Sequence, residues 1–294
     1  MELTPEEFRL FSDYIYSISG ILLRESKSYL IKQRLQPIAQ RVGCTSFDEF
    51  YERIRVGSLP KIEEQIINAI TTNETSFFRD GHPFVTFKDH VLPWLGEKIR
   101  QRKTRDGLRR GPKVSLWSAG SSTGQEPYSL AMLIGEYALD HRHLGIRKED
   151  FGLLATDISS EALSKAMGGE YTEMEIKRGL SPDRVERYFV KEGDRWVINS
   201  AIRIMVDFRQ VNLIKPFSMV GGFDVIMCRN VLIYFDHVVK TQMIQQFYHM
   251  LSEGGFLILG VTENLHPVPE RDEAFEPIRY GKTLFYRKPS GNFV

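Results

Sequence analysis

The sequence lacks several features that would assign it to common protein classes. It has only two cysteines, Cys44 and Cys228, in 294 residues, too few for a disulfide framework or a zinc site built from several cysteines. No stretch approaches the roughly 18 consecutive apolar residues of a membrane span, and the acidic segment 1–7 lacks the basic and apolar regions of a signal peptide. We therefore expect a cytoplasmic protein in a reducing compartment, without direct membrane insertion.

An excess of one charge sign is also absent. Lys and Arg total 39 and Asp and Glu total 38, so the formal net charge is +1. Proteins that bind nucleic acids usually carry a clear basic excess, so this balance argues against a nucleic-acid partner. The hydrophobic content of 42% is enough for a packed core, and the length suits two domains of about 100–200 residues each.

The first seventy residues have helical periodicity only. Capping boxes at residues 4–7 and 46–49 predict the starts of two helices. Another helical pattern covers about 26–42 and includes Pro37, where we expect a kink or a break because an interior proline costs about 3 kcal/mol. With a fourth, isoleucine-rich pattern, these segments predict an all-helical domain over residues 1–72.

Strand-like and helical segments alternate later in the chain, which is typical of a doubly wound, mostly parallel α/β sheet. A hairpin pattern predicts a small antiparallel β insertion at about 168–200, and two strand-like pieces around Gly281 predict an antiparallel pair. We assign residues 73–294 to this second domain. The predicted parallel strands cover residues 114–117, 151–156, 202–206, 223–228 and 256–259.

A glycine-containing turn after the first predicted strand is a candidate ligand site. Gly120 and Gly124 are spaced Gly-x-x-x-Gly, unlike the Gly-x-Gly-x-x-Gly of dinucleotide folds or a Walker loop. Pro127 predicts a helix over about 127–138 with Glu126 as its N-cap. A carboxylate here disfavours a phosphate ligand and favours one with a positive group; the alternative is a tight turn whose glutamate only caps the helix.

Polar residues also follow other predicted strands. Asp157 ends the second strand, where a carboxylate commonly accepts hydrogen bonds from ribose hydroxyls; the alternative is that it caps the next helix. Arg229 and Asn230 follow the buried strand 223–228, and the alternative there is an ordinary loop. Segment 71–80 interleaves polar and aromatic residues and, taken alone, is a domain linker.

Four segments together resemble the motifs of the CheR family, the chemotaxis receptor methyltransferases. They are residues 72–79 (TNETSFFR), 117–129 (WSAGSSTGQEPYS), 155–158 (ATDI) and 228–235 (CRNVLIYF), and the resemblance extends to 260–263 (GVTE). It implies a Rossmann-like methyltransferase sheet with a small all-α N-terminal domain. It also implies methyl transfer from S-adenosyl-L-methionine to glutamate side chains on the cytoplasmic helical bundle of chemoreceptors, giving methyl esters and S-adenosyl-L-homocysteine without a metal.

The resemblance further implies individual site residues. Arg79 and Tyr234 are expected near the transferred methyl group, Asp157 at the ribose, and Asn212 and Leu213 at the adenine. The full set of implied cofactor contacts is Asn73, Thr75, Arg79, Glu126, Asp157, Asn212, Leu213, Arg229 and Asn230.

Two local groups of basic residues stand out against the balanced total. Segment 98–113 contains eight basic residues, and we expect a solvated, mobile loop. Lys27, Arg34 and Arg41 recur every seven residues, a spacing that drifts by only about 20° per heptad on a straight helix. We hypothesise that this stripe contacts acidic residues around the methylated glutamates, so that residues 1–72 form a substrate-recognition domain; the alternative is a solvated basic face. We expect the protein to act as a monomer.

Two other functions remain open from the sequence. One is another cofactor-dependent enzyme on a similar fold, either a nicotinamide dehydrogenase or a small-molecule methyltransferase. The missing dinucleotide spacing and Glu126 argue against the dehydrogenase. The other is a non-catalytic module that binds S-adenosylmethionine and scaffolds signalling partners.

Some members of the CheR family bind a pentapeptide tether at the receptor terminus through the hairpin insertion. The corresponding loop here, residues 192–195 (EGDR), looks shorter than in those members. We therefore predict action that does not depend on a tether. Isothermal calorimetry with such a pentapeptide should detect no tight binding, and a tight complex would contradict the prediction.

Overall fold

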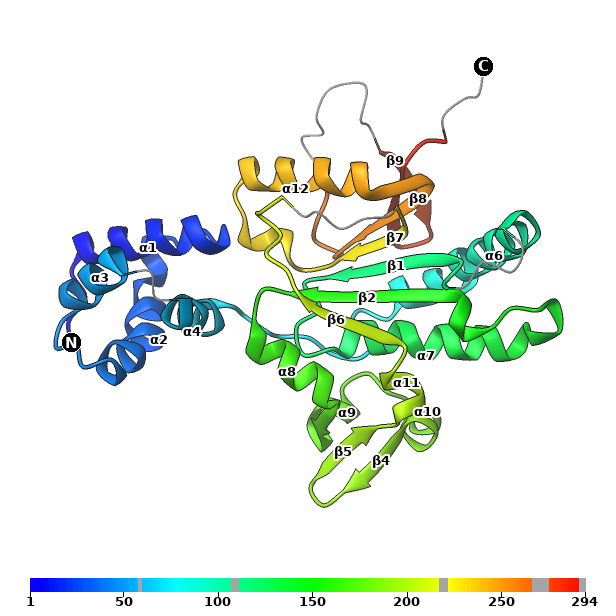
Figure 1. The fold of residues 1–294 in the computed structure, drawn as a ribbon, viewed down its shortest axis with the longest axis horizontal. Coiled ribbons are helices and arrows are strands. Elements are labelled where there is room, and N and C mark those ends of the chain that lie inside the picture. Colours follow the sequence, from blue (N-terminus) through cyan, green and yellow to red (C-terminus); the bar gives the residue numbers. More distant parts are fainter. Residues whose placement is uncertain (58–59, 107–110, 217–221, 266–274, 291–294) are drawn as a thin grey trace.

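The computed structural model describes the chain except for residues 58–59, 107–110, 217–221, 266–274 and 291–294. Its N-terminal part is a group of helices set beside a sheet (Figure 1). Phe11, Ile31, Phe47 and Ile66 are completely buried in a core that these helices share. The helices are α1 (Pro5–Ser19), α2 (Ser28–Arg41), α3 (Phe47–Val56) and α4 (Pro60–Ile70), and a short 3-10 turn, Glu25–Lys27, precedes α2.

Local sequence determines where these helices begin and end. The hydroxyl of Thr4 accepts a hydrogen bond from the Glu7 N–H, and the Glu7 carboxylate accepts one from the Thr4 N–H, which is the predicted capping box. Gly20 ends α1 in a left-handed conformation (φ 72°). Helix α2 runs through Pro37, so a break there is wrong: the buried residues on either side of Pro37 pack into the core and offset the lost hydrogen bond.

The second part is a seven-stranded sheet in the order β6-β2-β1-β7-β8-β10-β9. The first five strands in this order are parallel, and β10 and β9 are antiparallel, so the predicted sheet and terminal pair are confirmed. The strands are β1 (Val114–Ala119), β2 (Phe151–Asp157), β6 (Val206–Gln210), β7 (Phe223–Cys228), β8 (Leu251–Leu259), β9 (Glu276–Tyr280) and β10 (Thr283–Arg287).

Helices cover both faces of this sheet (Figure 1). On one face, Phe247 of α12 (His237–Met250) contacts Trp117 of β1. On the other face the core includes Leu95 and Ile99 of α6 (Leu92–Asp106) together with α7 (Gln125–Asp140). Helices α5 (His82–Thr86) and α8 (Ser160–Gly168) also belong to this domain. None of the helices in the described ranges is long and apolar enough to cross a membrane.

The predicted insertion is a separate antiparallel sheet with the order β3-β5-β4. Its hairpin strands match the prediction, and β3 is an additional strand. The elements of this insertion are β3 (Glu170–Thr172), α9 (Glu173–Lys177), α10 (Pro182–Tyr188), β4 (Phe189–Glu192), β5 (Arg195–Ile198) and α11 (Ser200–Arg203).

The strand of the large sheet that was expected at 202–206 is wrong. Residues up to Arg203 form the short helix α11, and β6 begins only at Val206.

The basic segment 98–113 is not the expected loop, because helix α6 extends to Asp106. Lys98 donates to Asp224 at 2.9 Å, and Arg102 makes two hydrogen bonds of 2.8 Å to the same carboxylate. The carboxylate of Asp224 is completely buried and also accepts from the Ser115 N–H. The positive charges of this helix therefore neutralise a buried acid at the start of β7. Residues 107–110 of the segment lie outside the described part of the chain.

This network predicts how much folding stability is lost when the charge of Asp224 is removed. Asp224→Asn should lower the free energy of unfolding by about 3 kcal/mol, because removing one partner of a buried ion pair leaves the other charges uncompensated. Chemical denaturation followed by circular dichroism measures the change. Asp207→Asn, which removes an exposed pair with Arg209, is the control and should change stability by less than about 1 kcal/mol. Equal effects of both substitutions would contradict the prediction.

Candidate functional site

A pocket lies where the helical domain meets the carboxyl ends of the parallel strands. Its wall includes Gly120 after β1, Asp157 at the end of β2, Asn212 after β6 and Asn230 after β7. Ligands of doubly wound sheets bind at this edge. The space measures about 1170 Å³ including its open mouth.

The pocket brings together most of the residues that were predicted from the sequence. Arg41 is the exception: it lies outside the pocket wall and donates to Gln65 on the exposed side of the helical domain. The predicted residues in the wall are Lys27, Arg34, Asn73, Thr75, Arg79, Glu126, Asp157, Asn212, Leu213, Arg229, Asn230 and Tyr234.

Asp157 shapes the glycine turn. One carboxylate oxygen accepts from the Ser122 N–H at 2.8 Å and the other from the Ser159 N–H at 2.9 Å. The N-cap of α8 is Ser159, so capping by Asp157 is not observed. Burial raises the pKa of Asp157, partly offset by these backbone hydrogen bonds. Each oxygen retains acceptor capacity for a ligand hydroxyl.

The prediction that Glu126 caps α7 is wrong. The N-cap is Gly124, in a left-handed conformation (φ 93°), and α7 begins at Gln125. Pro127 is tolerated because the first N–H groups of a helix have no partner within it. Glu126 therefore lies inside the first turn, where its side chain points into the protein and accepts a hydrogen bond from Ser118 at 2.9 Å.

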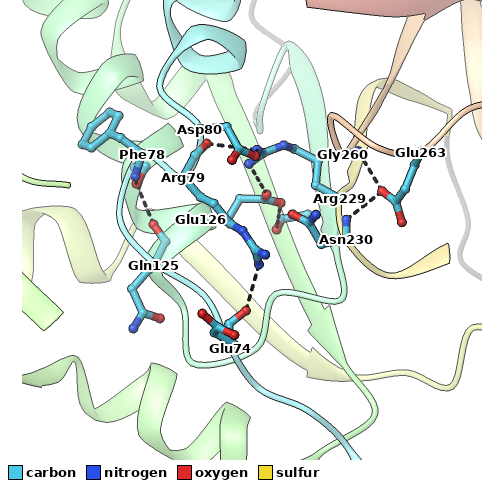
Figure 2. Close-up of polar contacts among 12 residues, drawn as sticks. Glu74, Phe78, Arg79, Asp80, Gln125, Glu126, Arg229, Asn230, Gly260 and Glu263 are labelled. Atoms are coloured by element: carbon cyan, nitrogen blue, oxygen red, sulfur yellow. Dashed lines mark hydrogen bonds and ion pairs between the residues drawn. The ribbon is translucent and has the colours of Figure 1, made fainter. Parts of the chain in front are cut away.

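Arg229 is at the centre of a buried charge cluster (Figure 2). Its side chain is only 1% exposed and pairs with Glu126 at 3.1 Å and with Asp80 at 2.7 Å. The same guanidinium donates to the carbonyl oxygen of Arg79 at 2.9 Å. Burial raises the pKa of Glu126, and Arg229 counteracts the rise. The Glu126 carboxylate is therefore already paired with Arg229. The sequence had suggested instead that it would be free to bind a positively charged group of the ligand.

Glu263 organises the loop after β7. Its carboxylate accepts backbone N–H groups from Asn230 and Gly260 at 2.7 Å each and from Ile233 at 3.2 Å. These bonds hold Asn230 in a left-handed conformation (φ 58°) and fix the start of the loop that leads to Tyr234. Neither Glu263 nor Asp80 was identified from the sequence as a site residue, although both lie in or directly beside the quoted motifs.

The helical domain supplies one wall of the pocket. The side chain of Asn212 donates to the Ile18 carbonyl at 2.8 Å, and the Leu22 N–H donates to the Tyr234 carbonyl at 3.1 Å. Arg79, in the segment that joins the two domains, is half-buried and donates to the Glu74 carbonyl at 2.9 Å (Figure 2). The pocket is therefore closed by contacts between segments far apart in the sequence.

The three basic residues of the proposed stripe have different surroundings. Lys27 precedes α2 rather than lying within it. Arg34 donates to the carbonyl oxygens of Ala69, Ile70 and Thr71 at 2.8–3.2 Å, so it caps the end of α4. Arg41 is exposed. They do not form one solvent-facing row, and their contact with a receptor stays a prediction.

Two buried polar atoms in the pocket wall lack a partner among the described residues. They are Nε of Arg229 and Oδ1 of Asn230. Buried polar atoms are nearly always paired, so a donor and an acceptor that both lack partners in one pocket suit a polar ligand.

Comparison with known proteins agrees with this geometry. Residues 73–280 match the S-adenosylmethionine-binding domain of CheR methyltransferase, and residues 6–71 match its all-alpha domain. Chemotaxis protein methyltransferase Cher2 of Pseudomonas putida is 40% identical over 90% of this chain and 91% of its own length. Chemotaxis protein methyltransferase 1 of Pseudomonas aeruginosa is 37% identical over 98% and 99%, and a Vibrio anguillarum chemotaxis protein methyltransferase is 34% identical over 97% and 98%.

The fold and the matched domains define an S-adenosylmethionine-dependent methyltransferase. The chain belongs to the CheR family of chemotaxis protein methyltransferases. The residues present fit the cofactor: the unpaired donor on Arg229 and the unpaired acceptor on Asn230 suit the carboxylate and ammonium of an amino-acid moiety, and Asp157 has acceptor capacity for hydroxyls.

Cofactor affinity tests the role of Asp157. Asp157→Asn should weaken S-adenosylmethionine binding about 10- to 100-fold, the equivalent of one hydrogen bond to a charged group, because the amide also turns a donor toward the Ser122 or Ser159 N–H. Calorimetric titration measures the dissociation constant. Asp140→Asn, at the exposed end of α7, should leave it unchanged. Unchanged affinity in Asp157→Asn would refute the assignment.

Proposed function

We propose that this enzyme methylates glutamate side chains on the cytoplasmic helical bundle of chemoreceptors, giving glutamate methyl esters and S-adenosyl-L-homocysteine. The observation that carries the proposal is the position of Arg79 and Tyr234 in the wall of the same pocket as the predicted cofactor residues. The relatives are named as chemotaxis protein methyltransferases, and this supports a chemotaxis protein as the substrate. Cytoplasmic location and action as a monomer are part of the proposal.

The chemistry requires little from the protein beyond alignment. An exposed glutamate has a pKa near 4.3, so it is already a carboxylate at neutral pH and needs no general base. When bound, S-adenosylmethionine supplies an electrophilic methyl group on a positively charged sulfur. The remaining task of the protein is to hold the carboxylate oxygen in line, and good alignment can contribute about 7–11 kcal/mol to lowering the barrier.

Arg79 is suited to orienting the substrate carboxylate. One of its nitrogens, Nη1, donates to the Glu74 carbonyl, which fixes the side chain while other N–H groups remain to bind an anion. A guanidinium binds a carboxylate through two parallel hydrogen bonds, and this also fixes its orientation. Tyr234, which carries a hydroxyl, lies in the same pocket wall. Both residues are proposed to orient the attacking oxygen.

Methyl transfer to a purified receptor fragment tests the proposed function. Radiolabelled methyl groups from S-adenosylmethionine should appear on a chemoreceptor cytoplasmic fragment and be released as methanol in mild base, as expected for methyl esters. Replacing the acceptor glutamates by alanine in the fragment should abolish labelling. Cofactor binding without labelling of any receptor fragment would favour a non-catalytic module, and transfer to a small molecule alone would favour the small-molecule methyltransferase.

Turnover of variants tests the two orienting residues. Arg79→Ala should lower kcat at saturating cofactor about 100-fold, the cost of a small misplacement of reacting groups, and Tyr234→Phe should lower kcat by a smaller factor. The exposed Arg100, which pairs only with Glu97 among the described residues, provides the control variant Arg100→Ala with unchanged kcat. Weaker cofactor binding with unchanged turnover of the bound complex would contradict the role of Arg79.

A further inference from the structure

The segment around Arg79 has an unusual backbone. Phe78 (φ 48°) and Asp80 (φ 68°) both adopt the left-handed conformation that L-residues rarely adopt, and Gly81 (φ 63°) follows. For a bulky residue such as Phe78 this conformation is costly, and it persists only where surrounding contacts impose it. Arg79 lies between two such residues, so the contacts that impose this backbone also determine where the Arg79 side chain is directed.

One guanidinium supplies two of these contacts. Nη2 of Arg229 donates to the Arg79 carbonyl at 2.9 Å and to the Asp80 carboxylate at 2.7 Å, and so binds two consecutive residues of the segment (Figure 2). On the other side, the Phe78 N–H donates to the Ser129 hydroxyl at 3.0 Å. Because Arg229 follows the central strand β7 and Ser129 is part of α7, the segment is attached to the rigid sheet domain at both ends.

Asp80 is the part of this arrangement that is outside the pocket. Arg79 and Arg229 are in the described pocket wall and Asp80 is not. The Asp80 side chain is 35% exposed, whereas Arg229 is 1% exposed. Without the Asp80 carboxylate, the buried guanidinium would retain Glu126 as its carboxylate partner, and the segment would keep its hydrogen bond through the Arg79 carbonyl but lose its charged one.

We propose that Asp80 is a positioning residue for methyl transfer. Its ion pair with Arg229 holds the left-handed backbone conformations of Phe78 and Asp80 and thereby directs Arg79, which lies between them, toward the pocket. Asp80 itself does not touch the reactants. This inference rests on the proposed function, because it takes Arg79 as the residue that orients the substrate carboxylate.

Two substitutions separate the ion pair from the backbone requirement. Asp80→Asn keeps the shape and the tolerance for a left-handed backbone but removes the charge, and Asp80→Gly keeps the backbone freedom but removes the carboxylate. Both should lower kcat for receptor methylation about 10- to 100-fold, with less than about a threefold change in the dissociation constant of S-adenosylmethionine. Asp89→Asn, at an exposed position of the following helical segment, should change neither.

A double substitution distinguishes positioning of Arg79 from a general structural role. If Asp80 acts through Arg79, Asp80→Asn should lower kcat by less than about threefold further in an Arg79→Ala background, because coupled residues are not additive. A full multiplicative loss in the double variant would overturn the proposal, and so would unchanged kcat in Asp80→Asn alone.

A readout that does not depend on activity separates this proposal from the proposed function. Hydrogen–deuterium exchange of peptides covering residues 74–84 should be about tenfold faster in Asp80→Asn, since the Phe78 N–H loses protection, while peptides from the helical core keep their rates. Unchanged exchange in this segment would overturn the proposal whatever the activity. A wild-type enzyme that methylates no receptor fragment would instead refute the proposed function.

Discussion

The site depends on the buried guanidinium of Arg229. Transferring this charge out of water is costly, and its pairing with Glu126 and Asp80, together with the hydrogen bond to the Arg79 carbonyl, offsets the cost. The two carboxylates come from the first turn of α7 and from the segment that joins the domains, while Arg229 follows β7. A single desolvated charge thus fixes the relative positions of a helix start, a strand end and a connecting segment, and the pocket is formed by all three.

The helical domain forms part of the pocket wall, besides the substrate recognition predicted for it. Asn212 and Tyr234 bind its backbone at Ile18 and Leu22, and the hydroxyl of Tyr16 donates to Asp236 at 2.7 Å at the N-cap of α12. Asn68 in α4 donates to Ser160 at 3.1 Å and accepts from Ser159 at 2.9 Å at the start of α8. These contacts place the segment after α1 in the pocket wall, so the helical domain forms part of the site itself.

The sequence predicted those features that depend on neighbouring residues. Capping at Thr4, the parallel strands with their polar ends, and the hairpin insertion follow from local patterns. The motif resemblance located most of the pocket wall. One failed prediction involves a partner distant in the sequence: α6 replaces the expected loop, and its Lys98 and Arg102 pair with Asp224, more than a hundred residues away. Likewise, the roles of Arg34, Asp80 and Glu263 become visible only when their partners are brought close by folding.

The charge of the pocket wall fits two reactants of opposite sign. It contains four cationic side chains (Lys27, Arg34, Arg79 and Arg229) and three anionic ones (Glu74, Glu126 and Asp157), a formal sum of +1. A strongly negative wall would repel a glutamate carboxylate, and a strongly positive wall would repel a sulfonium. Because methyl transfer neutralises one charge of each sign, a nearly balanced wall disfavours neither reactant, and the fixed charges of Arg229 and Glu126 compensate each other. The balance seen across the whole sequence therefore recurs locally, where it is compatible with the reaction that we propose.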